Sequence, residues 1–260
     1  MGIAKRLTCV LSGAAMVATA LVAAGAPASA GEEDKGQSAS SYPHSRPSTW
    51  GVIGRNTLGS PNAVFRDGPL GRPDGNPSAT QSPPFGNGSL GIIVADGTEK
   101  IDFGNETDFA GLRLEDINLL HYWIYVGMDS LSGVSLPGAL LEVDPGLDPN
   151  VTYSSLVYLP EDSESPSAPE TPANNVWQKY RANNGGSAWF ATGATGAAIG
   201  CTGSDPCSFA ELKEKLPDAE ITYSLAISKG RDNAFVGAVD GLRINEQLYD
   251  FEFSGVRQLD

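Results

Sequence analysis

Histidine and cysteine, the residues that most nucleophile and zinc sites require, are scarce in this chain of 260 residues. Its two histidines, His44 and His121, are far from each other and from the cysteines in sequence. A serine or cysteine nucleophile needs a base such as histidine within hydrogen-bonding reach, and zinc needs about four nitrogen, sulfur or oxygen ligands. The composition therefore leaves little room for Ser-His or Cys-His catalysis and argues against zinc.

A pair of carboxylates gives the only fragment of a glycosidase pattern. Glu142 and Asp144 alternate along a short apolar run, so a strand would place both on one face. Jelly-roll glycosidases of the laminarinase type carry a third acidic residue in an E-x-D-x-E or E-x-D-x-x-E strand. Gly146 and Leu147 occupy both third positions, and Pro145 interrupts the strand. We therefore expect no catalysis, with a secreted glycoside hydrolase as the alternative.

Aromatic side chains alternate along the apolar run at residues 119–126. Leu120, Tyr122, Ile124 and Val126 would share one face of a strand, and His121, Trp123 and Tyr125 the other. If the first face is core, the second row points outward, where rings of this kind stack on sugars. The alternative is a central strand covered by loops on both faces. We take His121, Trp123 and Tyr125, with Trp189 as a further candidate, as the predicted ligand-binding residues; Trp177 is expected in the core.

Asp240 is the predicted metal ligand. It shares the even positions of a strand with Val236, Ala238, Leu242 and Ile244, which predicts a carboxylate pointing into the core. An unpaired buried charge is costly, and a structural calcium ion, the one cofactor expected, would compensate it. Backbone amides donating to Asp240 are the alternative. Asp250 and Glu252, in the next strand, are expected on a solvated face.

The elements that position these residues are mostly strands. Apolar runs of strand length recur between turns rich in Gly, Pro and Asn, and Asp96-Gly97 is a hairpin signal. One helix is predicted near 208–216, because Ser208 and Glu211 form a capping box and Pro217 follows. The fold class expected is all-β, a two-sheet antiparallel, jelly-roll-like sandwich. It would occupy residues 49–260 as a single domain.

The first thirty residues have the pattern of a secretory signal peptide. Lys5 and Arg6 precede an apolar run, and Ala28-Ser29-Ala30 is an A-x-A cleavage site. Residues 1–30 are therefore the predicted signal peptide, and residues 31–48 a disordered leader rich in Ser, Pro and charge. The mature protein should be secreted, with no membrane segment after cleavage.

Charge and cysteines agree with an extracellular protein. The net charge is −14, and a surface with this charge repels phosphate backbones. Nucleic acid is therefore not an expected partner. Cys201 and Cys207 are separated by turn residues and would form a disulfide in an oxidising compartment.

Several segments together resemble a known group of proteins. They include "FAGLRLEDINLLHYWIYV", "LPGALLEVD", "FAELKEKLPDAEI" and "AFVGAVDGLRINEQLYDFEF". Their order resembles secreted proteins of actinobacteria with a jelly-roll, LamG-like sandwich, over about residues 50–260, and more loosely carbohydrate-binding modules. The resemblance implies a β-sandwich outside the cell and no particular activity. The expected function is non-catalytic binding of an extracellular glycan or cell-wall polysaccharide; an interaction protein without a small ligand is a further alternative.

Overall fold

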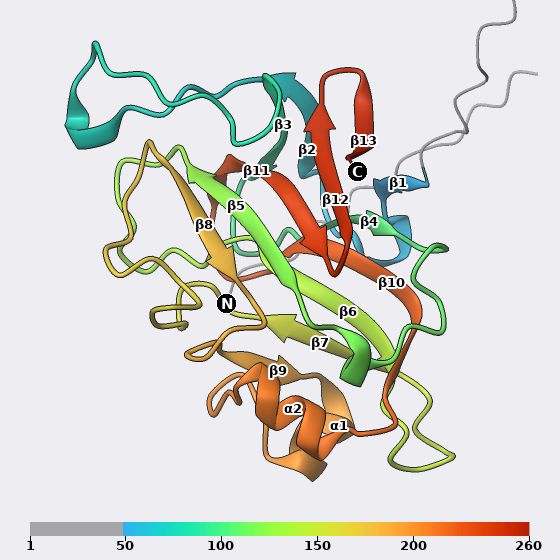
Figure 1. Cartoon of the computed structure of the whole chain (residues 1–260). Helices are drawn as coiled ribbons and strands as arrows, with labels where there is room; N and C mark the ends of the chain where they lie inside the picture. Colours follow the sequence, from blue (N-terminus) through green and yellow to red (C-terminus); the bar gives the residue numbers. More distant parts are fainter. Residues whose placement is uncertain (1–48, 260) are drawn as a thin grey trace, which may run out of the picture. The chain divides into compact units, whose positions relative to one another are not determined.

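Residues 49–259 are described by the computed structural model of this protein, and they form two antiparallel sheets (Figure 1). The predicted signal peptide and leader lie outside these residues. Within the described part of the chain, no helix is long and apolar enough to cross a membrane.

Each sheet combines strands that are consecutive in sequence with strands from distant parts of the chain. The first sheet contains, in spatial order, β1 (Trp50–Val52), β4 (Ile101–Asn105), β10 (Glu220–Lys229), β6 (Gly138–Asp144), β7 (Ser154–Tyr158) and β9 (Trp189–Ala191). The second contains β13 (Gly255–Leu259), β12 (Gln247–Glu252), β11 (Phe235–Ile244), β3 (Gly88–Val94) and β2 (Asn62–Asp67). β5 (Leu120–Val126) pairs with β11, and β8 (Trp177–Arg181) pairs with β5. This arrangement confirms the predicted two-sheet antiparallel sandwich.

The alternation predicted for β5 is confirmed. Leu120, Tyr122, Ile124 and Val126 are at most 3% exposed and belong to the core between the sheets. Burial of side chains of this size stabilises the fold by about 1.5–3 kcal/mol each. A slip of one residue would turn this face outward, so the core also fixes which side chains of β5 face solvent.

A β-bulge in β11 reverses the faces of that strand. The register with β5 pairs Asp240 with Trp123, and then shifts so that Arg243 pairs with His121. Gly241, between them, has φ +62°, a conformation that glycine adopts without strain. Leu242 therefore points into the core, whereas Asp240 points to the outer face with Trp123. The prediction that Asp240 shares a face with Leu242 and Ile244 is wrong for this reason.

The turn at Asp96-Gly97 is not a hairpin. β3 before it pairs with β2 and β11 in the second sheet, and β4 after it pairs with β1 and β10 in the first. The chain crosses from one sheet to the other here. A Cβ on Gly97 would lie 2.9 Å from the carbonyl oxygen of Asp232, so the glycine is required by a close approach between two loops.

Two short helices accompany the sheets. α2 (Phe209–Lys215) confirms the predicted helix, and both bonds of the Ser208–Glu211 capping box are present. The predicted Cys201–Cys207 disulfide is formed just before it, with a Cα–Cα distance of 5.3 Å. α1 (Gly193–Ile199) was not predicted, because its two glycines are poor helix formers. Single turns of 3-10 helix complete the described structure: η1 (Gly54–Asn56), η2 (Pro73–Gly75) and η3 (Leu114–Asp116).

Candidate ligand-binding site

The outward row of β5 lies on the outer face of the second sheet. His121, Trp123 and Tyr125 are each partly exposed, between buried neighbours. On one side they face β8, whose Arg181, Lys179 and Trp177 are their register partners. We call the surface formed by His121, Trp123, Tyr125, Lys179, Arg181 and Arg243 the outer binding face.

Two hollows meet at Tyr125. The larger, of about 630 Å³, is lined by Arg72, Asp74, Asn174 and Asn175 together with small and apolar residues. The smaller, of about 220 Å³, lies toward Arg66 and Val236. The Tyr125 hydroxyl donates to Oδ1 of Asn175 at 3.2 Å, which holds the ring between the hollows. Amides, a carboxylate and a guanidinium around an aromatic ring are groups that can bond the hydroxyls of a sugar.

The rim of these hollows is a loop fixed on β8. The amide of Arg72 donates to the carbonyl of Asn175 at 2.7 Å. Gln81 bonds both backbone groups of Trp177, accepting from its amide at 2.7 Å and donating to its carbonyl at 3.0 Å. The indole of Trp177 donates to the carbonyl of Pro69 at 2.9 Å.

Trp177 is therefore 2% exposed because the loop at residues 68–82 covers it. Its ring lies 5.6 Å from that of Tyr125, on the outer face. It is buried as expected, but under a loop and not between the sheets.

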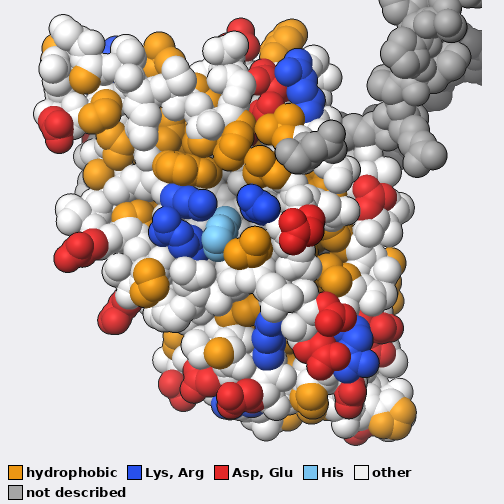
Figure 2. Space-filling model, viewed as in Figure 1, with side chains coloured by type: hydrophobic (Ala, Val, Ile, Leu, Met, Phe, Trp, Pro, Cys, Tyr) orange, Lys and Arg blue, Asp and Glu red, His pale blue; other side chains and the backbone are white. Residues whose placement is uncertain are grey.

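Cationic side chains surround His121. Arg181 and Arg243 are its register partners on either side, and Lys179 precedes Arg181 by two residues on β8. Figure 2 shows a pale-blue histidine among blue Lys and Arg side chains on this face, and His121 is the one histidine of residues 49–259. Burial, followed by the charges of Lys179 and Arg181, lowers the pKa of His121 to about 4.

These three cations lack an acidic partner in the part of the chain that the structure describes. Within residues 49–259, Lys179, Arg181 and Arg243 form no ion pair. Burial lowers the pKa of Lys179, and the charges of Arg181 and Arg243 lower it further. The cluster is thus a local concentration of positive charge.

Asp240 lies under the loop before β3 and is fully buried. Its Oδ1 accepts from the amide of Phe251 at 3.1 Å, and its Oδ2 from the amide of Phe85 at 3.0 Å. Burial raises the pKa of Asp240 to about 7, although these amides oppose the shift. No three metal-ligating side chains lie together in residues 49–259. The contacts are those of the backbone-amide alternative, and calcium at Asp240 stays a prediction.

Asp250 and Glu252 do not form a solvated face. They are 3% and 8% exposed, because residues 85–88 lie over them. The amide of Asn87 donates to Oε1 of Glu252 at 2.8 Å. A Cβ on Gly88, the first residue of β3, would lie 2.8 Å from the Cα of Glu252, so glycine is needed for the chain to come this close.

Trp189 is a core residue and not a surface candidate. It is fully buried, and its ring packs between those of Tyr158 and Phe209, at 5.4 and 5.2 Å. Its Nε1 donates to the carbonyl of Ala182 at 2.6 Å. The strand pattern alone does not distinguish Trp189 from Trp123, because both faces of β9 are flanked by apolar and aromatic residues.

Glu142 is held as an anion. Burial opposes its ionisation, but hydrogen bonds from Ser224, Asn56 and Tyr153 and the charge of Arg55 lower its pKa. The third residue of the glycosidase pattern, which would be the acid, is absent, and an ionised Glu142 has no proton to donate to a leaving group. The geometry at Glu142 is that of a structural carboxylate.

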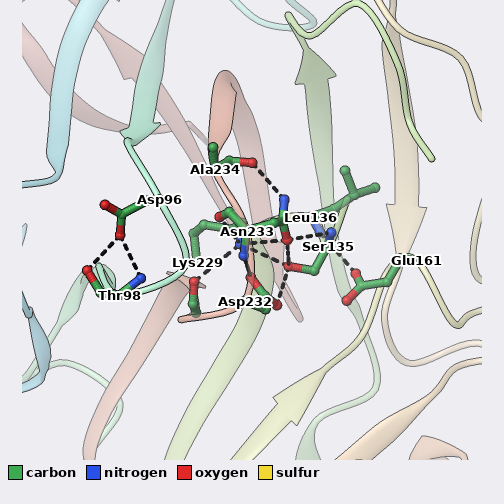
Figure 3. Close-up of polar contacts among 10 residues, drawn as sticks. Asp96, Thr98, Ser135, Leu136, Glu161, Lys229, Asp232, Asn233 and Ala234 are labelled. Atoms are coloured by element: carbon green, nitrogen blue, oxygen red, sulfur yellow. Dashed lines mark hydrogen bonds and ion pairs between the residues drawn. The ribbon is translucent and has the colours of Figure 1, made fainter. Parts of the chain in front are cut away.

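A second polar cluster lies on the first sheet, beside a pocket of about 320 Å³ (Figure 3). The buried Lys229 forms an ion pair with Asp232, and its Nζ donates to Ser135 Oγ at 2.9 Å. The Ser135 hydroxyl in turn donates to Asp232. An ammonium group in an ion pair has no lone pair with which to activate Ser135, so this network joins two loops and supplies no nucleophile.

The pattern within single strands did not predict the cations of the outer binding face. Trp177, Lys179 and Arg181 do alternate in "VWQKYR", which would have placed them on one face. The alternation does not show that this strand pairs with β5, which is what brings Lys179 and Arg181 beside His121. Arg243 joins the cluster only because of the bulge at Gly241.

Comparison of the chain with family models, with curated proteins and with solved structures finds no match in any of the three. The resemblance to secreted actinobacterial sandwiches stays a prediction.

Proposed function

We propose that this protein is a secreted, non-catalytic binding protein that takes a glycan on its outer binding face. The observation that carries the proposal is the position of Tyr125, a partly exposed ring between two hollows. Sugars present apolar C–H faces and hydroxyls at once, and an aromatic ring rimmed by amides complements both.

The size of the face indicates an extended ligand. From Tyr125 to His121 the strand rises by about 13 Å, longer than one sugar ring. Each aromatic contact contributes about 1 kcal/mol. A single sugar would therefore bind weakly, and useful affinity requires a polymer that contacts several side chains.

The proposal predicts that Tyr125→Ala and Trp123→Ala lose binding to polysaccharide. The measurement is affinity electrophoresis in gels containing soluble polysaccharides, with melting temperatures of all variants. We expect each variant to lose about fivefold to tenfold in affinity, with a small change in melting temperature because both side chains are partly exposed.

Tyr223→Ala is the matched control. Tyr223 is 47% exposed and packs on Tyr153 at the first sheet, away from β5. If Tyr223→Ala loses binding as much as Tyr125→Ala does, the site is not on β5. If no polysaccharide retards the parent protein, the interaction-protein alternative replaces this proposal.

A further inference from the structure

The outer binding face carries unbalanced positive charge on a molecule that is otherwise strongly acidic. The net charge of the chain is −14, yet Lys179, Arg181 and Arg243 gather around His121 without a carboxylate partner in the described residues. Lys179 and Arg181 lie two residues apart on β8, and Arg243 lies on the other side of His121, so like charges gather and repel one another on one face of the sheet. Such an arrangement is stabilised when a ligand supplies the missing negative charge.

We infer that the glycan bound by this face is acidic, and that Arg181, Arg243 and Lys179 hold its anionic groups beside His121. This inference rests on the proposed function and names the class of its ligand. The ligand's charge would be a carboxylate or a sulfate, since both accept the paired hydrogen bonds that guanidinium groups donate.

The geometry favours direct contact between these cations and a ligand. Lys179, Arg181 and Arg243 are each partly buried on the sheet, so an ion pair formed there is less screened than one at a fully exposed position. Nε of Arg243 donates to the carbonyl of Asn245 at 2.9 Å, which fixes one edge of its guanidinium group. Within residues 49–259 its guanidinium forms no ion pair, so it can take an anion from a ligand.

The cations and the aromatic rings follow one strand. Trp123 lies between Tyr125, at the hollows, and His121, at the cations. A polymer along β5 would stack on rings at one end and pair its charges at the other. Nucleic acid also offers rings and anions, but the amides, carboxylate and guanidinium that line the larger hollow at Tyr125 complement the hydroxyls of a sugar, so an acidic glycan is favoured.

The test uses two pairs of polysaccharides that differ only in charge. Dextran is compared with dextran sulfate, and fully methyl-esterified polygalacturonate with polygalacturonate, in affinity electrophoresis of the purified protein. We expect the charged member of one pair to bind about tenfold tighter or more, and about 0.5 M NaCl to remove the difference. The pair in which the charged member binds tighter shows whether the face prefers sulfate or carboxylate groups.

Arg181→Gln and Arg243→Gln should each lose about tenfold in affinity for the charged polymer, and Arg181→Lys should lose less because it keeps the charge. Arg231→Gln is the matched control, since Arg231 is an exposed arginine that lines the pocket on the first sheet. Melting temperatures identify any variant that fails to fold, and Arg181→Lys then takes the place of Arg181→Gln.

Each contrary result has a distinct meaning. Equal binding within both pairs, unchanged in the arginine variants but lost in Trp123→Ala, overturns the inference and leaves the proposed function standing. Binding of charged polymers that survives Trp123→Ala and Tyr125→Ala is simple ion exchange and overturns both. Single-stranded poly(dT) binding tighter than every polysaccharide also overturns both, in favour of a nucleic-acid partner.

Discussion

The same residue type takes opposite roles in this protein, depending on what lies opposite it. Trp189 is enclosed by Tyr158 and Phe209, whereas the partly exposed Trp123 lies on the outer face between its register partners Lys179 and Asp240. Both stand in short apolar strands. The difference arises from the partner strands, which local sequence does not specify.

His121 offers a measurable consequence of its surroundings. Its pKa of about 4 lies below the ordinary 6.5 because of burial and then the charges of Lys179 and Arg181. Between these two values the unfolded chain binds a proton at His121 that the folded protein does not, so folding stability rises with pH across this range and is lost as pH falls.

We expect the parent protein to lose on the order of 1–2 kcal/mol more than His121→Gln when urea unfolding is measured at pH 6.5 and then at pH 4. NMR titration of the His121 ring should give a midpoint near 4. A midpoint near 6.5, with parallel stability curves for the two proteins, would show that the cations do not act on this ring.

At the level of elements, the extra residue at Gly241 decides to which face of the sheet the side chains of β11 point. It turns Asp240 outward and brings Arg243 beside His121. Without the bulge, the strand would continue its alternation and one of these two groups would point into the core.

Gly241→Ala should disrupt this arrangement. Its φ of +62° is strained for alanine, and a Cβ would lie 2.4 Å from Cε2 of Phe85. We expect a loss of about 2–3 kcal/mol in urea unfolding. Gly203→Ala, with no atom within 4 Å of the added Cβ, should change stability by less than about 0.5 kcal/mol. Equal stabilities for the two variants would contradict the required bulge.

The elements were predictable to the extent that they depend on local patterns. The alternation in β5 and the capping box of α2 each depend only on residues that are close in sequence, and both are confirmed. The bulge at Gly241 and the crossing at Asp96-Gly97 depend on which strands pair, a long-range choice. For that reason the outward row of β5 was predicted, whereas the cations beside it were not.

For the whole molecule, the proposed function requires export. The A-x-A pattern predicts that protein recovered from the medium begins at Gly31, with the sequence Gly-Glu-Glu-Asp. Removing Lys5 and Arg6 also makes the net charge more negative by two, from −14 to −16. N-terminal sequencing checks the prediction, and an intact Met1 on cell-associated protein would contradict it.

The loop at residues 68–82 has a consequence for how such a protein can diverge. The loop is attached to the second sheet chiefly by the hydrogen bonds of Gln81 and of the Trp177 indole. Arg72 and Asp74, between these contacts, line the larger hollow. Changes of length or composition between the attachment points would reshape that hollow without disturbing either sheet. Among descendants of this chain, ligand preference is therefore expected to drift through insertions and deletions in one surface segment, while both sheets stay constant.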